Sequence, residues 1–203
     1  MKVLIVYYST YGNTYRMAQL VAEGVRGVPG AEPIMRRVPE LIPASVIESR
    51  VDMKAGQEIQ KDVPLATVDD FREAGAIAFG TPTRFGNVSA QLKNQIDQLT
   101  SLWLQGELEG KPAGVFVSTG SLHGGQETTI LTLAAPLIHL GMIFVGVPYS
   151  VRELFSTQGG GSPYGPGHVA GSDGRRDIDP DEAAICRALG RRLAEVGKRL
   201  KGE

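Results

Sequence analysis

The sequence predicts an α/β protein in which a parallel sheet is covered by helices on both faces. Short, almost wholly apolar runs alternate with segments of helical spacing, and the runs are continuously apolar, as strands buried on both sides require. The 203 residues, 42% of them hydrophobic, contain no internal repeat and no change of composition that would mark a domain boundary. We therefore expect residues 1–203 to form a single domain built on a doubly wound sheet.

Five strands can be assigned in chain order. Four are continuously apolar, whereas the second is less apolar and is expected at the sheet edge. The five runs are Val3–Tyr8, Glu32–Val38, Ala74–Phe79, Ala113–Val117 and Met142–Val147. Helical patterns lie between them, which predicts five parallel strands.

The first and last helices have the clearest patterns. Apolar residues share one face of each helix, at Met17, Leu20, Val21 and Val25 and at Ile185, Leu189, Leu193, Val196 and Leu200. The last helix also has a recognisable start. Asp179 can cap it, Pro180 suits its first position, and Glu182 at the third position completes a capping box.

The stretch Leu131–Tyr149 has no charged residue over 19 positions, about the length of a membrane span. Pro136, His139 and Gly141 interrupt it, and after Gly141 helical spacing gives way to β-branched and aromatic residues. We interpret it as a buried helix followed by a buried strand, with no integral membrane segment. One cysteine is present and the N-terminal apolar run is too short for a signal sequence, so we expect a cytoplasmic protein.

Several classes of function are disfavoured. The charges nearly cancel, with 21 basic and 22 acidic residues, and without a basic stripe nucleic acid is not an expected partner. His123 and His168 have no metal-ligand partner at a recognisable spacing, and no G-x-S-x-G elbow occurs. We therefore expect neither metal nor serine-nucleophile chemistry.

The segment Ser9–Thr14 follows the first strand and precedes the first helix. A hydroxyl-rich turn at such a place directs backbone N–H groups at an anion. The segment lacks the G-x-x-x-x-G-K-[ST] pattern of ATP and GTP sites and the G-x-G-x-x-G pattern of dinucleotide sites. One glycine among hydroxyl residues suits a terminal monophosphate. From this segment alone, the alternative is an ordinary Ser/Thr helix N-cap.

The loops after strands one, three and four are expected to meet. In the strand order 2-1-3-4-5, ligands bind beyond the carboxyl ends of the strands, between strands one and three. Thr81–Asn87 offers an arginine and an aromatic ring that suit a flat heterocycle with carbonyl groups. Ser118–Glu127 offers glycines that let backbone approach the rim of that heterocycle. Together the three loops predict a site for a phosphorylated heterocycle.

These motifs resemble those of the WrbA family of NAD(P)H:quinone oxidoreductases, which are FMN-containing relatives of flavodoxin. The resemblance spans nearly the whole chain and rests on Ser9–Thr14, Gly80–Asn87, His123–Glu127 and Gly161–Gly165. It implies a flavodoxin-like fold, bound FMN, a homotetramer, and two-electron reduction of a quinone by NADH or NADPH. The hydride would pass through flavin N5 in a ping-pong cycle, so no side chain is expected to act as catalytic acid or nucleophile.

The resemblance also assigns binding residues, position by position. It places the FMN phosphate at Ser9, Thr10, Tyr11, Gly12, Asn13 and Thr14. It places around the isoalloxazine Pro82, Thr83, Arg84, Phe85 and Asn87. On the pyrimidine side it places Ser118, Thr119, Gly120, Ser121, Gly124 and Gly125, in a loop that the family also has in a shorter form without the Leu-His found here. His139 matches a flavin-contacting histidine, and the substrates are expected at Tyr11 and Trp103.

Two segments exceed what the sheet requires. Pro39–Thr67 connects the second and third strands, and Ser156–Arg176 is rich in glycine and lacks periodicity. Connections of this length are usually functional or take part in oligomer contacts, with disorder as the alternative. We expect both to bury surface between the subunits of the tetramer, so that active sites are built partly from neighbouring chains.

Other readings of the same residues stay open. Taken alone, His139 would more often be a hydrogen-bonded core histidine, Trp103 could fill core volume, and Arg84 could pair with a surface carboxylate. For the whole protein the main alternative is a flavodoxin-type one-electron carrier, although such carriers are typically strongly acidic. A third alternative is a regulatory or scaffold protein that binds FMN structurally.

Overall fold

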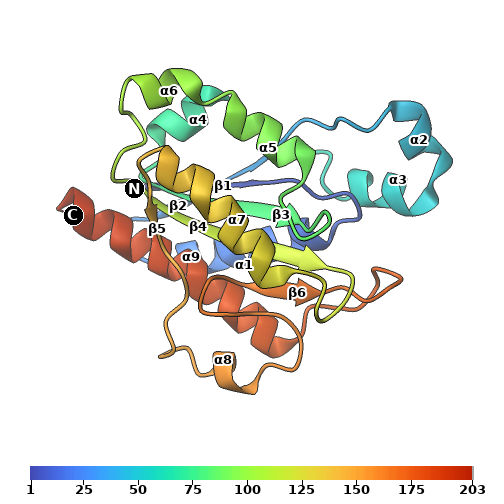
Figure 1. The fold of residues 1–203 in the computed structure, drawn as a ribbon. Coiled ribbons are helices and arrows are strands. Elements are labelled where there is room, and N and C mark those ends of the chain that lie inside the picture. Colours follow the sequence, from blue (N-terminus) through green and yellow to red (C-terminus); the bar gives the residue numbers. More distant parts are fainter. Residues whose placement is uncertain (203) are drawn as a thin grey trace.

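A parallel sheet with the strand order β2-β1-β3-β4-β5 crosses the centre of the molecule (Figure 1). The computed structural model describes residues 1–202. The strands of this path are β1 (Lys2–Tyr7), β2 (Glu32–Arg37), β3 (Ala76–Pro82), β4 (Pro112–Thr119) and β5 (Ile143–Phe144). The predicted flavodoxin-like order is confirmed, and β3 and β4 extend to Pro82 and Thr119, into what the sequence predicts as loop.

Helices cover both faces of the sheet. On one face lie α1 (Asn13–Arg26) and α9 (Pro180–Lys201). On the other lie α4 (Val68–Glu73), α5 (Ala90–Asp97), α6 (Thr100–Leu104) and α7 (Gln126–His139). Successive residues of β1 enter opposite cores, since Ile5 packs with α1 and α9 whereas Leu4 and Val6 pack with the other helices. This is why the strand is continuously apolar.

The fifth strand is shorter than the predicted Met142–Val147. Only Ile143 and Phe144 pair with β4, and the Val147 N–H donates instead to the Pro163 carbonyl at 2.9 Å. The carboxyl half of β4 pairs with a sixth strand, β6 (Gly167–Val169). This strand comes from the glycine-rich segment, which also contains the end of the short helix α8 (Glu153–Ser156). Three residues are too few to show a strand periodicity in the sequence.

The long connection Pro39–Thr67 folds against its own chain. It contains α2 (Ala44–Ser49) and α3 (Val51–Glu58), and it returns beside β2 through a bridge between Arg37 and Leu65. We call this segment the insertion. The bridge shows that the insertion packs against the rest of its own chain.

Two other predictions concern helix ends. α9 begins as predicted, because the Asp179 side chain accepts from the Glu182 N–H and the Glu182 side chain accepts from the Asp179 N–H. The uncharged stretch Leu131–Tyr149 holds the end of α7 and all of β5, which confirms a helix followed by a strand. The predicted burial of the strand is wrong, because Ile143 is exposed and Phe144 is half-buried. Within residues 1–202, no helix combines the length and apolarity that a membrane crossing needs.

Candidate functional site

The loop between β1 and α1 leaves the first turn of α1 without a side-chain cap. Gly12 occupies the cap position with a φ of 93°, a left-handed conformation that glycine adopts without strain. No side chain in the described part of the chain caps this helix, whereas Ser89 caps α5 and Asp179 caps α9. The reading of Ser9–Thr14 as an ordinary Ser/Thr cap is therefore wrong. The N–H groups of the first turn remain available to an anion.

Hydroxyl groups surround this turn. Ser9, Thr10 and Thr14 are all buried. Ser9 Oγ accepts from the Gly12 N–H at 3.1 Å, and Thr10 Oγ1 accepts from the Arg84 guanidinium at 2.9 Å. The first turn of α1 holds no acidic residue that would repel an anion. The loop therefore brings hydroxyls, backbone donors and one cation to a single place, which we call the phosphate loop.

Asn13 has a buried acceptor atom without a partner. Its amide group donates to the Gly174 carbonyl at 3.1 Å, and its Oδ1 makes no hydrogen bond within residues 1–202. Leaving such an acceptor unsatisfied costs about 1–3 kcal/mol. A ligand hydroxyl or a protonated phosphate oxygen would satisfy it. The residues present therefore fit a phosphorylated ligand that carries hydroxyl groups, such as FMN.

The loop after β3 forms a two-residue hairpin turn. The Arg84 N–H donates to the Asn87 carbonyl at 2.8 Å, and the Asn87 N–H donates to the Arg84 carbonyl at 3.1 Å. Phe85 and Gly86 between them have φ values of 54° and 76°, as a type I′ turn requires. This conformation is strained for phenylalanine and holds its ring fully exposed at the tip of the turn. Among the described residues, Arg84 pairs with no carboxylate, and its guanidinium donates instead to Thr10 of the phosphate loop.

The loop after β4 lies against the loop after β3. The Thr83 N–H donates to the Ser118 carbonyl at 2.9 Å. A Cβ atom on Gly125 would lie 2.9 Å from Gly86 Cα, so glycine is needed at this contact. The three predicted loops therefore do meet at the carboxyl edge of the sheet, through Arg84 on one side and Gly125 on the other.

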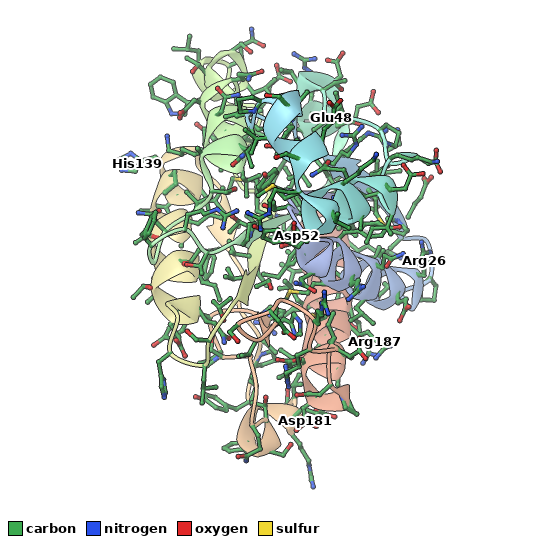
Figure 2. The ribbon with its side chains drawn as sticks, turned by 90° about the vertical axis from the view of Figure 1, so that its right-hand side faces the viewer. Arg26, Glu48, Asp52, His139, Asp181 and Arg187 are labelled. Carbon is green, nitrogen blue, oxygen red and sulfur yellow. The ribbon has the colours of Figure 1, made fainter. Side chains whose placement is uncertain are left out.

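His139 and Trp103 lie elsewhere. They line a cavity of about 530 Å³ between α5, α6 and α7, and one end of this cavity is lined by Asn87 of the turn after β3. α7 has 14 residues, so His139 lies about 20 Å from Gly125 along the helix. Figure 2 shows His139 projecting outward at the rim of the molecule. Both side chains are exposed, so the interpretations of His139 as a core histidine and of Trp103 as a core filler are wrong. The residues that line their cavity include none of Ser9–Thr14.

A buried charge cluster ties the glycine-rich segment to α9, and sequence reasoning missed it. Glu182 is fully buried and accepts hydrogen bonds from the backbone of Gly160 and Val169 and from the side chains of His168 and Arg176. Burial opposes its ionisation, but the hydrogen bonds from His168, Val169 and Asp179 outweigh burial and hold the pKa of Glu182 at about 2. The cluster fixes β6 beside β4, and the chain then continues to Gly174 at the phosphate loop.

α3 of the insertion and the turn that follows it also touch the phosphate loop, through residues that carry no chemical signature in the sequence. Gln57 and Gln60 donate to the Ser9 carbonyl, at 3.3 and 2.8 Å. The signal that could have pointed to them is the length of the insertion alone, which does not say which of its residues make contact.

The chain is similar to known proteins in sequence and in fold. Residues 1–155 match the model of the family described as NADPH-dependent FMN reductase. Proteins named NAD(P)H dehydrogenase (quinone) from Geobacter sulfurreducens and Geobacter metallireducens are each 47% identical over 204 residues, covering 100% of both chains. A solved WrbA-like flavodoxin from Agrobacterium tumefaciens has a TM-score of 0.66 at 24% identity, covering 98% of each chain. The chain therefore belongs to the FMN reductase family and, within it, to the flavodoxin-like NAD(P)H dehydrogenases (quinone) that the WrbA motifs indicate.

Proposed function

We propose that this chain binds FMN where the three loops meet and uses it to reduce quinones with electrons from NAD(P)H. The observation that carries the proposal is the uncapped first turn of α1, with buried hydroxyls around it and an unpartnered acceptor on Asn13. The phosphate would lie at Ser9–Thr14. The isoalloxazine would lie between the turn at Arg84–Asn87 and the loop Ser118–Gly125. The names of the relatives support the activity.

The chain's contribution is binding and orientation. When bound, FMN supplies N5, an atom that accepts a hydride from NAD(P)H and passes it to a quinone. Arg84 is held by Thr10, so a cation is fixed beside the ligand. Tyr11 and Phe85 are exposed rings that would border the open side of the site and exclude water from it. We further propose that nicotinamide and quinone occupy this side in turn, which gives ping-pong kinetics.

The proposed activity can be tested with the purified chain and FMN. NAD(P)H oxidation is expected to require added benzoquinone, and initial rates at several quinone concentrations should give parallel double-reciprocal lines. Intersecting lines would contradict the shared side for the two substrates. NAD(P)H oxidation that does not respond to benzoquinone would favour the one-electron carrier instead.

Removing the Ser9 hydroxyl is expected to weaken FMN binding by about one to two orders of magnitude. Each hydrogen bond to a charged group contributes roughly 1.5–3 kcal/mol, and Ser9 also closes the turn through Gly12. Titration of apo-protein with FMN measures the effect in Ser9→Ala. Ser49→Ala, which changes an exposed serine of α2, is the matched control and should bind FMN as the wild type does. Equal FMN affinities in the two variants would show that the phosphate does not bind at this loop.

We also propose that Trp103 and His139 serve the site of a neighbouring chain. Both line one exposed cavity, which includes Asn87 but no residue of their own phosphate loop. A tetramer, as the WrbA resemblance implies, would let this cavity cover the open side of a neighbour's FMN. Light scattering on a fully active FMN-bound protein is expected to give the mass of an oligomer, and an active monomer would contradict the proposal.

A further inference from the structure

We propose that α3 and the turn after it support the phosphate loop and hold it in its binding conformation, with Gly56 of the helix and Gln60 of the turn as positioning residues. The inference rests on the proposed FMN site and goes beyond it, because it assigns a role to the insertion within one chain. Three sets of contacts carry it: a close backbone approach, a pair of buried hydrogen bonds, and an anchor at the start of the insertion.

The backbones of α3 and the phosphate loop touch at Gly56. A Cβ atom on Gly56 would lie 2.5 Å from the Thr10 carbonyl oxygen and 2.6 Å from Tyr11 Cα, closer than real Cβ atoms approach backbone. From the other side, a Cβ atom on Gly12 would lie 2.5 Å from Ile59 Cδ1. Any larger residue at position 56 must therefore move either the helix or the loop.

Gln60 fixes the orientation of one peptide group of the loop. Its side chain is 2% exposed, and its Nε2 donates to the Ser9 carbonyl at 2.8 Å and to the Gly56 carbonyl at 2.7 Å. A trans peptide points its C=O and N–H in opposite directions. Holding the Ser9 carbonyl toward α3 therefore turns the Thr10 N–H away from α3 and leaves it free to donate to a ligand.

Glu40 anchors the start of the insertion. Its carboxylate accepts from Tyr8 Oη at 2.9 Å, from Gln91 Nε2 at 2.9 Å and from Gln57 Nε2 at 3.4 Å. Burial, assisted by Glu40 and opposed by Thr10, raises the pKa of Tyr8, so the hydroxyl stays protonated and donates. The end of β1, α5 and α3 are thus joined at one carboxylate. Figure 2 shows the insertion, marked by Glu48 and Asp52, at the side of the molecule where α1 begins.

Support of this kind acts on the phosphate and not on the heterocycle. The contacts reach Ser9, Thr10 and Tyr11, and none of those made by Gly56 or Gln60 reaches the turn at Arg84–Asn87 or the loop Ser118–Gly125. Riboflavin has the same heterocycle as FMN but lacks the phosphate. The ratio of FMN affinity to riboflavin affinity therefore measures how much these contacts contribute to binding of the phosphate. A general loss of structure would lower both affinities.

The test uses Gly56→Ala and Gln60→Leu in the full chain, with apo-protein titrated separately with FMN and riboflavin. We expect each variant to lose roughly 10-fold to 100-fold in FMN affinity, since misplaced donors cost about one to two charged hydrogen bonds. Riboflavin affinity should change by less than about 3-fold, the size of effects outside the contact region. Lys54→Ala, on the exposed face of α3, is the matched control and should change neither affinity.

The outcomes distinguish failure of this inference from failure of the proposed FMN site. Wild-type FMN affinity in both Gly56→Ala and Gln60→Leu overturns the inference, and so does an equal loss of FMN and riboflavin affinity. If Gly56→Ala fails to fold, as thermal unfolding of apo-protein would show, Gln60→Leu alone decides, because it keeps a side chain of similar volume. If Ser9→Ala loses the preference for FMN while Gly56→Ala and Gln60→Leu keep it, only the inference fails. If wild type and Ser9→Ala have the same FMN preference, the proposed site fails and the inference fails with it.

Discussion

Replacing Glu182 with glutamine is expected to lower the free energy of unfolding by roughly 3–5 kcal/mol at neutral pH. The carboxylate is fully buried and accepts hydrogen bonds from His168, Arg176 and backbone N–H groups. Glutamine has nearly the same shape, but its amide would place a donor against groups that themselves donate, and Arg176 would lose its buried counter-charge. Urea unfolding of the two proteins measures the difference.

The loss of folding stability in Glu182→Gln should be larger at neutral pH than in acid. The pKa of Glu182 is about 2 in the folded protein against an ordinary value of 4.5, so its ionisation stabilises the fold fully above the ordinary value. That contribution disappears as the pH falls toward 2. The stability difference between wild type and variant should therefore be constant near neutrality and shrink in acid.

Asp181→Asn is the matched control for Glu182→Gln. It removes an acidic residue at the neighbouring position of the same helical turn, where the side chain accepts from Ser156 Oγ at 2.8 Å and from no other group within residues 1–202. We expect it to cost less than about 1 kcal/mol, the usual size of a helix-dipole effect at a surface. If Glu182→Gln proves as stable as Asp181→Asn, the charge cluster is not what holds the glycine-rich segment.

Most of the sheet could be predicted because its strands are buried on both faces. β1, β3 and β4 each enter two cores, and that burial requires the continuous apolar runs visible in the sequence. β6 could not be predicted, since it has three residues and depends on glycines for its close approach: a Cβ atom on Gly165 would lie 2.2 Å from the Val115 carbonyl oxygen. The same approach ends the pairing of β5 with β4, which is why β5 is shorter than its apolar run.

The site could be predicted only where its residues lie on loops with a recognisable motif. Ser9–Thr14 is contiguous, and strand order alone brings Arg84 and Gly125 beside it. Gln60 could not be found in this way, because it is 51 residues from Ser9 and a buried glutamine has no distinctive pattern. The interpretation of His139 as a core histidine is wrong for a different reason. An apolar helix face is expected to be buried in its own chain, but here it is exposed, as a face covered by another chain would be.

If another chain covers this exposed face, two variants that are each defective, Gly12→Val and Trp103→Ala, should restore activity to each other in one oligomer. Gly12→Val is expected to lose FMN, because position 12 has a φ of 93° and a Cβ atom there would lie 2.5 Å from Ile59 Cδ1. Trp103→Ala is expected to keep FMN but to lose at least about 30-fold in kcat/KM, the effect of removing an aromatic wall worth roughly 2 kcal/mol. Leu104→Ala, which truncates the exposed neighbour of Trp103, is the matched control and should stay active.

In a mixed oligomer, the two hypotheses about which chain Trp103 serves predict opposite results. If Trp103 serves a neighbouring chain, an FMN-bearing Trp103→Ala chain receives the tryptophan of an adjacent Gly12→Val chain, and quinone-dependent NAD(P)H oxidation returns. If Trp103 serves its own chain, every chain that holds FMN lacks the tryptophan, and mixing restores nothing. Co-expression of the two variants with different affinity tags, followed by isolation of oligomers that carry both tags, decides between them. Activity in these hybrids no higher than that of Trp103→Ala alone would contradict the proposal that Trp103 serves the site of a neighbouring chain.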